Sequence, residues 1–336
     1  MSRMLAVIAL LGIAFYAHGQ RLSSYNVDAS SISVSGFQSG ASLATALHVS
    51  HSSLFGGVGL VAGSPYYCAQ GEHGKMLTSC SFLPETFSLR TAIKKAEFNA
   101  EYGLVDPLLN LTDSRVYIYA GRFDPIISPQ NGHNVEDFYN VFVRDRSLIK
   151  TVYHEASSHA FITDSYGNHC LKLAPPFINN CGYDQAGDIL RHTTGLKLRE
   201  RGYPSPLNIY TFNQSEFGAE SLADKGFMYV PKSCQRGSSC AVHVALHGCL
   251  MSYSSPLARK QFVEHSGYNA WAESNDIIIL YPQASSTRIV GGNIFGCWDF
   301  YGYTNPVGDD GAYVTKEGEQ IKAIYEMVQR LISDDQ

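Results

Sequence analysis

Short β-branched or apolar runs in this chain are each followed by a longer segment of helical character. A run of four to eight such residues is typical of a buried strand, and apolar residues at a spacing of three to four are typical of a helix. Strands that alternate with helices favour a mostly parallel sheet with helices on both faces, which is an α/β fold. The pairs of predicted strand and helix are Ser31–Ser35 with Gly40–His51, Val116–Ala120 with Val135–Arg144, and Ile149–His154 with Gly187–Thr194.

The last third of the chain repeats this pattern. Val242–His247 and Ile277–Tyr281 are predicted strands, and Lys260–Ser274 and Lys316–Ile332 are predicted amphipathic helices. The least regular segment is Phe212–Lys232, which we expect to connect two parts of one sheet, with a domain boundary as the alternative.

The first residues have the pattern of a cleaved secretory signal. Arg3 precedes an apolar run over Met4–Tyr16, which ends in Ala17-His18-Gly19. We therefore expect residues 1–19 to be removed and residues 20–336 to form one catalytic domain. No other stretch approaches the roughly 20 apolar residues that a membrane helix requires. The sequence thus predicts a secreted, extracellular protein without a membrane anchor.

Composition narrows the class of partner. The formal net charge is −5, and 45% of the residues are hydrophobic against 16% that are charged. Such a chain can bury a large core, but it lacks the basic patch of a nucleic-acid-binding protein. We expect no nucleic-acid partner, and we expect a monomer.

Eight cysteines are present, an even number that leaves no obligatory free thiol, and export makes disulfides the expected state. Three pairs of cysteines adjacent in the sequence would close loops of modest size, and elimination leaves a fourth pair. A zinc site is the alternative. Because the sequence contains no C-x-x-C pair, we expect no metal. The expected pairs are Cys68 with Cys80, Cys170 with Cys181, Cys234 with Cys240, and Cys249 with Cys297.

Two N-x-S/T sequons begin at Asn110 and Asn213. Such tripeptides accept N-linked glycans in a eukaryotic secretory pathway. The sequence predicts both asparagines as glycosylation sites on surface loops.

A candidate nucleophile lies where the first predicted strand meets the first helix. Ser39 follows Gly36-Phe37-Gln38 and precedes an alanine-rich helix, as a serine on a strand-to-helix turn does. The strict G-x-S-x-G pattern fails around Ser39, because Phe37 and Ala41 hold the glycine positions and Gly36 and Gly40 are displaced. A serine at this place also fits a helix N-cap, so both roles stay open on local sequence.

A serine nucleophile needs a histidine base and a carboxylate that orients it. Asp124 follows the predicted strand Val116–Ala120, and His159 lies in the loop beyond Ile149–His154. The ends of parallel strands are where such sheets gather functional groups, and Ser, Asp, His is the chain order of α/β-hydrolases. We expect Ser39, Asp124 and His159 to form a catalytic triad.

The run from Val242 to Cys249 resembles a strand that enters a His-Gly turn, which supplies an oxyanion-hole amide and normally precedes the nucleophile. Here it follows Ser39 by about two hundred residues. If both interpretations hold, the chain is circularly permuted, and its last strands complete the sheet that its first strands begin.

Together these blocks resemble the secreted polyhydroxybutyrate depolymerases with a circularly permuted α/β-hydrolase fold, over nearly all of the mature chain. The motifs that carry the resemblance are Gly36-Phe37-Gln38-Ser39-Gly40-Ala41, His159 with Thr163-Asp164-Ser165-Tyr166-Gly167-Asn168-His169-Cys170, Ile178-Asn179-Asn180-Cys181-Gly182-Tyr183-Asp184, Leu246-His247-Gly248-Cys249, Gly267-Tyr268-Asn269-Ala270-Trp271-Ala272, Ile279-Leu280-Tyr281-Pro282-Gln283 and Gly296-Cys297-Trp298-Asp299.

The resemblance implies a serine esterase that cuts poly(3-hydroxybutyrate) or related esters through an acyl-enzyme, with no cofactor. The amides of Gly40 and Cys249 would form the oxyanion hole. The disulfide between Cys249 and Cys297 would bring Trp298 to the cleft, where its ring could bind the substrate. The alternative is that Trp298 is an ordinary aromatic residue of the core. Gln38 and Ala41 depart from the Ser and Gly that the family favours, which bears on the shape of the elbow and on substrate preference.

Two other functions fit the same sequence. One is a secreted esterase for acetylated or feruloylated polysaccharides or for short-chain lipids, which would use the same triad. The other is a secreted binding protein on the same fold without catalysis, which would leave Ser39 unreactive toward a serine-directed phosphonate.

Overall fold

The computed structural model describes residues 20–286, 293–305, 309 and 311–333 of the chain. The predicted signal segment, residues 1–19, lies outside the described residues. None of the helices in the described ranges is long and apolar enough to cross a membrane.

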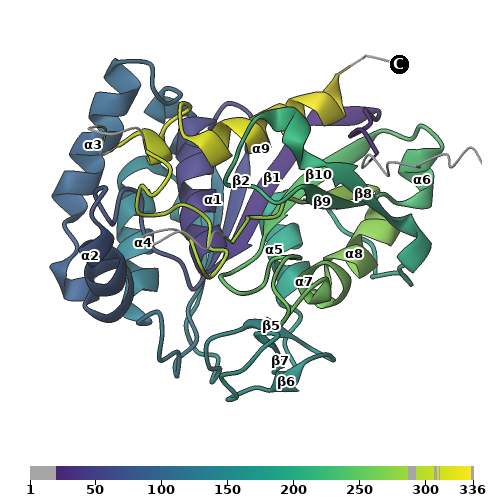
Figure 1. The fold of residues 1–336 in the computed structure, drawn as a ribbon, viewed down its shortest axis with the longest axis horizontal. Coiled ribbons are helices and arrows are strands. Elements are labelled where there is room, and N and C mark those ends of the chain that lie inside the picture. Colours follow the sequence, from purple (N-terminus) through teal and green to yellow (C-terminus); the bar gives the residue numbers. More distant parts are fainter. Residues whose placement is uncertain (1–19, 287–292, 306–308, 310, 334–336) are drawn as a thin grey trace, which may run out of the picture.

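An eight-stranded sheet organises the molecule (Figure 1). Its order is β4-β3-β2-β1-β10-β11-β9-β8, and every neighbouring pair is parallel except β11 with β9 and β9 with β8. The strands are β1 (Val27–Phe37), β2 (Gly57–Val61), β3 (Arg115–Tyr119), β4 (Ile149–Val152), β8 (Ile209–Asn213), β9 (Lys225–Tyr229), β10 (Cys240–Leu246) and β11 (Ile277–Tyr281).

A second, three-stranded sheet projects from the body at the bottom of Figure 1. It is formed by β5 (Phe161–Thr163), β6 (Asn168–His169) and β7 (Ile178–Asn180), in the order β5-β7-β6. The disulfide between Cys170 and Cys181 ties the end of β6 to the residue after β7.

Helices pack on both faces of the large sheet, as the alternation of the sequence predicts. Successive side chains of a strand point to opposite faces, so each strand feeds two cores. In β10, Val242 and Val244 contribute to the core under α1, α4 and α9, while Ala241 and Ala245 contribute to the core under α5, α7 and α8. The helices of the described residues are α1 (Ser39–Ser50), α2 (His73–Leu77), α3 (Leu89–Glu101), α4 (Gln130–Phe142), α5 (Gln185–Thr193), α6 (Lys232–Gln235), α7 (Gln261–His265), α8 (Tyr268–Asn275) and α9 (Glu319–Ile332).

The circular permutation is visible at the centre of the sheet. Strand β1 lies between β2, which follows it in the sequence, and β10, which begins about two hundred residues later. The two ends of the described fold also meet, because the backbone N–H of Tyr25 donates to the carbonyl of Leu331 at 2.9 Å. A chain whose ends lie side by side can be permuted without changing its core.

One expectation requires correction. The helix predicted over Lys260–Ser274 is broken into α7 and α8, because Gly267 has a φ of +97° that turns the chain between them. The segment Phe212–Lys232, expected to connect two parts of one sheet, runs from the end of β8 through β9, and both strands belong to the large sheet.

All four predicted disulfides are present, and no cysteine is free. Three of them close short loops with sequence separations of 12, 11 and 6 residues. The fourth joins Cys249, just beyond β10, to Cys297 across 48 residues. It fixes the loop at the carboxyl end of β10, beside the end of β1.

Candidate active site

Asp124 and His159 meet at the carboxyl ends of two neighbouring strands. Nδ1 of His159 lies 2.7 Å from Oδ2 of Asp124, and both side chains are buried. The other carboxylate oxygen accepts the backbone N–H groups of Ile126 and Ile127 at 2.8 and 2.9 Å. The carboxylate is therefore fixed on both sides, and it orients the imidazole through Nδ1.

Backbone hydrogen bonds tie the loop that carries Asp124 to the loop that carries His159. The N–H of Arg122 donates to the carbonyl of Glu155 at 3.0 Å, and the N–H of Phe123 donates to the carbonyl of Ser157 at 3.1 Å. These bonds continue the pairing of β3 with β4 beyond the strands. The sheet thereby sets the distance between the acid and the base.

The residue at the centre of the turn between β1 and α1 is Gln38. It has φ 54° and ψ −115°, whereas β1 ends at Phe37 and α1 begins at Ser39. A residue other than glycine is strained by about 1–3 kcal/mol in such a backbone conformation. It keeps this conformation only where the surrounding structure imposes it. The surroundings of this turn therefore impose its backbone conformation.

The structure does not bring Ser39 to the Asp124–His159 pair. Ser39 is the first residue of α1 and is 1% exposed. Its Oγ accepts the backbone N–H of Trp298 at 3.2 Å and lies 3.3 Å from the sulfur of Cys249. No hydrogen bond joins Ser39 to His159 within the described residues.

The two amides predicted for the oxyanion hole have different surroundings. The N–H of Cys249 donates to Oε1 of Gln38 at 2.7 Å, so it points toward the elbow. Gly40 belongs to the first turn of α1, whose amides have no acceptor within the helix. Gly40 packs closely on the end of β10, where an added Cβ would lie 2.4 Å from the carbonyl oxygen of His247.

His247 holds the loop that presents the Cys249 amide. Its Nε2 accepts the backbone N–H of Ala284 at 3.1 Å, which leaves Nδ1 to donate to the carbonyl of Gly248 at 2.7 Å. Complete burial lowers the pKa of His247 to about 4. A neutral imidazole with its proton on Nδ1 satisfies both contacts, so this histidine has a structural role.

Trp298 does not form a wall of the cleft. Its side chain is fully buried, and its indole N–H donates to the carbonyl of His247 at 3.0 Å. The expectation of a substrate-binding Trp298 is therefore corrected to the alternative, a core aromatic. The physical reason is that the Cys249–Cys297 disulfide brings this segment against the end of β10, where the ring packs inward.

An apolar pocket of about 300 Å³ opens beside His159. Most of its lining is apolar, and much of that comes from the segment between β6 and β7, which the sequence analysis did not single out. The sequence signal for this wall is a run of apolar residues around Pro175 and Pro176. This run lies in a stretch without a strand or helix pattern. The lining residues are Phe37, Gln38, Ile126, His159, Leu173, Ala174, Pro175, Phe177, Cys249 and Leu250.

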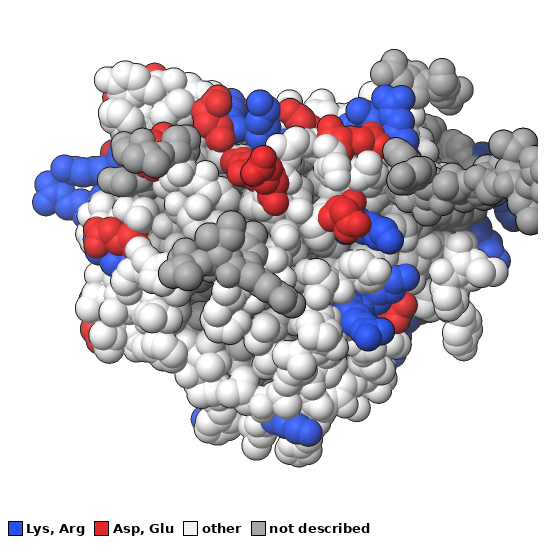
Figure 2. Space-filling model, viewed as in Figure 1, with Lys and Arg blue, Asp and Glu red and all other residues white. Residues whose placement is uncertain are grey.

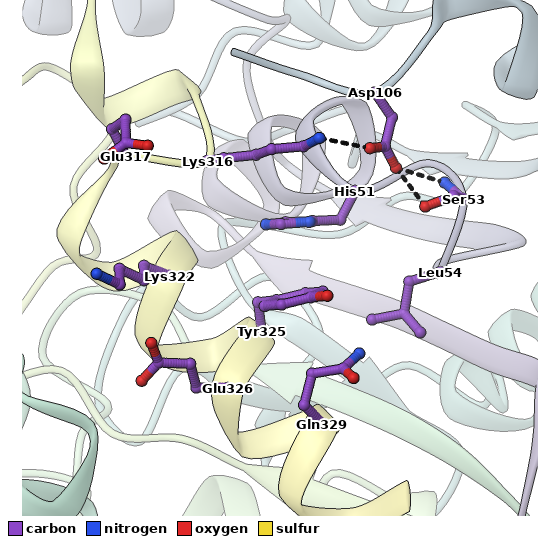
Figure 3. A pocket seen from close by; sticks show the side chains of 10 residues that line it. All are labelled: His51, Ser53, Leu54, Asp106, Lys316, Glu317, Lys322, Tyr325, Glu326 and Gln329. Atoms are coloured by element: carbon purple, nitrogen blue, oxygen red, sulfur yellow. Dashed lines mark hydrogen bonds and ion pairs between the residues drawn. The ribbon is translucent and has the colours of Figure 1, made fainter. Parts of the chain in front are cut away.

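A second cavity, of about 410 Å³, lies at the opposite end of α1 (Figure 3). The helix has 12 residues and is therefore about 18 Å long, which separates this cavity from the elbow. Lys316 pairs with Asp106 at 2.7 Å, and the ring of His51 stacks on Tyr325 at 4.1 Å. These contacts fasten the segment before α9 and α9 itself to the body, and we assign the cavity a structural role.

The two sequons differ in exposure. Asn110 is exposed in the turn before β3, while Asn213 is half-buried at the end of β8 and its Oδ1 accepts the N–H of Ser215. Glycosylation of both stays a prediction.

Comparison with known proteins places this geometry in a family. The chain is 34% identical to a polyhydroxybutyrate depolymerase of Talaromyces funiculosus over 98% of this chain and 97% of that protein. The chain belongs to the polyhydroxybutyrate depolymerase family. No family model matches the sequence. A second relative, the poly(3-hydroxybutyrate) depolymerase of Delftia acidovorans, is 36% identical over 98% of this chain, which spans 65% of that longer protein.

Solved structures of depolymerases confirm the fold. The crystal structure of the enzyme from Penicillium funiculosum has a TM-score of 0.85 and 32% identity, and 94% of this chain covers all of it. A serine-to-alanine variant of a PHB depolymerase, complexed with an R3HB trimer, has a TM-score of 0.84 and 33% identity, with the same coverage. The circularly permuted α/β-hydrolase fold predicted from the sequence is therefore confirmed.

Proposed function

We propose that this chain hydrolyses ester bonds of poly(3-hydroxybutyrate), or of its oligomers, outside the cell. The observation that carries the proposal is the hydrogen-bonded Asp124–His159 pair beside an apolar pocket, in a member of the depolymerase family. The relative solved with an R3HB trimer supports the same class of substrate.

The pair supplies the acid–base chemistry that ester hydrolysis requires. Asp124 holds the proton of His159 on Nδ1, so that Nε2 is free to accept a proton from the attacking oxygen. The ionised carboxylate then stabilises the imidazolium, which returns the proton to the departing alcohol. Once the Gln38 carboxamide releases it, the amide of Cys249 would donate to the oxygen of the tetrahedral intermediate.

The pocket suits an uncharged polyester. Its wall from Leu173 to Phe177 offers carbon surface to methyl and methylene groups, and none of the described residues that line it carries a carboxylate or an ammonium group. On the face shown in Figure 2, charged side chains gather along the upper part and at the left and right edges, while the described residues of the middle and lower parts are mostly uncharged. A polymer without charge loses little solvation on such a surface.

We further propose that the protein acts as a secreted monomer whose partner is the ester, with neither nucleic acid nor a membrane as partner. The secretory pattern of residues 1–19 and four disulfides support export. The net charge of −5 disfavours binding to nucleic acid.

The test is release of 3-hydroxybutyrate products from the R3HB trimer and clearing of a polymer suspension by the purified protein. His159→Ala, which leaves the other residues that line the pocket in place, should abolish product release while the trimer still binds. The proposal fails if the trimer neither binds nor is cleaved.

A second function, binding of the polyester without turnover, is favoured by one contact. Oε1 of Gln38 occupies the N–H of Cys249 that the intermediate would need. Trimer binding without product release, in the wild type and in His159→Ala alike, would establish this function instead.

A further inference from the structure

Two glycines frame Gln38, not Ser39. Gly36 and Gly40 stand two positions before and two positions after Gln38, so this turn has the pattern G-x-Q-x-G. In the G-x-S-x-G elbow, the nucleophile is the central residue of a sharp strand-to-helix turn. Judged by its glycines, the centre of this turn is Gln38.

Close approaches show that both glycines belong to the elbow. A Cβ added to Gly36 would lie 2.2 Å from the carbonyl carbon of Gly40, and one added to Gly40 would lie 2.4 Å from the oxygen of His247. The backbone therefore has to be glycine at both positions for α1 to begin so close to the ends of β1 and β10. The register of the turn is fixed by these contacts, and it puts residue 38 at the strained centre.

The side chain of Gln38 lies where an attacking group belongs. It lines the pocket together with His159 and Cys249, and its Oε1 is 2.7 Å from the backbone nitrogen of Cys249. The carboxamide thus reaches the amide that would stabilise an oxyanion, one of the groups that an elbow side chain faces.

Ser39 is one residue further along, and its hydroxyl has a different environment. It is not among the residues that line the pocket, and it accepts the N–H of the buried Trp298. To reach His159, its side chain would have to leave a site where it is 1% exposed. The hydroxyl instead joins α1 to the segment after the Cys249–Cys297 disulfide.

We infer that Gln38 occupies the nucleophile position of this chain, so that Ser39 does not attack the ester and no acyl-enzyme forms. A carboxamide is not a nucleophile of the kind that enzymes use for acyl transfer. The inference rests on the proposed hydrolysis of the polyester and changes its first step.

The attacking oxygen is then that of a water molecule. His159 Nε2 takes one proton of the water as its oxygen bonds to the ester carbon, and the carbon–oxygen bond to the alcohol breaks. The proton passes from His159 to the leaving alkoxide, which gives one acid and one alcohol. The Gln38 carboxamide has to leave the amide of Cys249 for the ester oxygen to bind there.

A serine-directed alkyl fluorophosphonate tests the inference directly. Attack by an activated hydroxyl on phosphorus displaces fluoride and leaves a covalent adduct whose mass and position can be measured. We expect the wild type to remain unlabelled and Gln38→Ser to be labelled on residue 38. Gln38→Ser should also cleave the R3HB trimer about 10²-fold or more faster than the wild type, with a burst of p-nitrophenol from p-nitrophenyl butyrate.

Three variants separate the possible explanations. Gln38→Ala removes the carboxamide without adding a hydroxyl and should stay unlabelled. The double variant Gln38→Ser with Ser39→Ala should be labelled as fast as Gln38→Ser, and thermal melting should show that each variant is folded. Labelling of Ser39 in the wild type, with loss of both label and activity in Ser39→Ala, would overturn the inference, as would a folded Gln38→Ser that the phosphonate does not label.

Failure of the proposed function gives a different result. If the polyester is not the substrate, the trimer will neither bind to nor be cleaved by any variant, yet Gln38→Ser will still be labelled by the phosphonate. If the inference fails, trimer binding stays while the label follows Ser39.

Discussion

Asp124 holds His159 with one carboxylate oxygen and is itself held through the other. Two backbone N–H groups bind Oδ1, and Nδ1 of the imidazole binds Oδ2. An amide at this position could keep the backbone contacts, but its NH₂ group would face Nδ1. The imidazole would then have its proton on Nε2, which is the wrong tautomer for a base.

For Asp124→Asn, we therefore expect trimer cleavage to fall by about 10³–10⁴-fold while the fold is retained. Product release and thermal melting measure the two effects. Glu155→Gln is the matched control, since Glu155 is a carboxylate on the loop that carries His159 but pairs with His154. Equal activity of Asp124→Asn and the wild type would show that the pair has no catalytic role.

At the scale of elements, the loop after β10 depends on a long-range link. The Cys249–Cys297 disulfide spans 48 residues, whereas the Cys234–Cys240 disulfide spans 6. A cross-link that closes a longer loop removes more entropy from the unfolded chain. The loop that carries the Cys249 amide is therefore tied down by the link that stabilises the fold more.

Replacing both Cys249 and Cys297 by Ala should lower the free energy of unfolding by about 4 kcal/mol, against about 2 kcal/mol for the Cys234 and Cys240 pair. Urea denaturation of the two double variants measures the difference. Only replacement of Cys249 and Cys297 should also slow trimer cleavage, because only this disulfide positions the Cys249 amide. A larger loss of stability for the second pair would contradict the ranking.

The segment between β6 and β7 supplies much of the apolar pocket wall. Leu173 lines the pocket and is 45% exposed, so a bound polyester would cover the rest of its side chain. Leu173→Ser should raise KM for the trimer about 5-fold, which is about 1 kcal/mol of lost apolar contact, with kcat little changed.

Leu207→Ser is the control for this change, because Leu207 is 86% exposed and does not line the pocket. Steady-state kinetics on the trimer compare the two variants. The same KM for Leu173→Ser and for the wild type would exclude this wall from the binding site.

At the scale of the whole molecule, buried histidines make stability depend on pH. Burial lowers the pKa of His48 to about 3, of His243 to about 3 and of His247 to about 4, below the usual 6.5. Between pH 6.5 and these values the unfolded chain binds protons that the folded chain does not. Stability therefore rises with pH in this range and is lost as the pH falls.

Below pH 6.5 each of these histidines should contribute up to about 1.4 kcal/mol per pH unit to the loss. Urea denaturation at pH 5 and at pH 7 measures the total. His243→Gln, at a site where the ring contacts Ser33 and Ser35, should make the pH dependence shallower. A free energy of unfolding that does not change between pH 7 and pH 5 would contradict this account.

Much of the architecture follows from local sequence. Period and length predicted β1, β3, β4, β10 and β11, together with α9. The signal is strongest where burial is continuous, as along β10, β11 and the second half of β1. Strand β2 was missed, since Gly57 and Gly59 weaken the strand pattern of a five-residue segment. The hairpin of β8 and β9 was not recognised as sheet; β8 is the edge strand, and β9 lies between β8 and β11.

The sequence by itself determined the alternation of strands and helices, the disulfide pairs, and the placement of Asp124 and His159 in loops at strand ends. Only the tertiary structure decided which residue is at the centre of the elbow and that Trp298 is buried. The reason is that Gly40 packs on the end of β10, about two hundred residues away in the sequence. That contact fixes the register of the turn to a single residue. A shift by one residue would exchange Gln38, whose side chain faces the pocket, for Ser39, whose side chain faces the core.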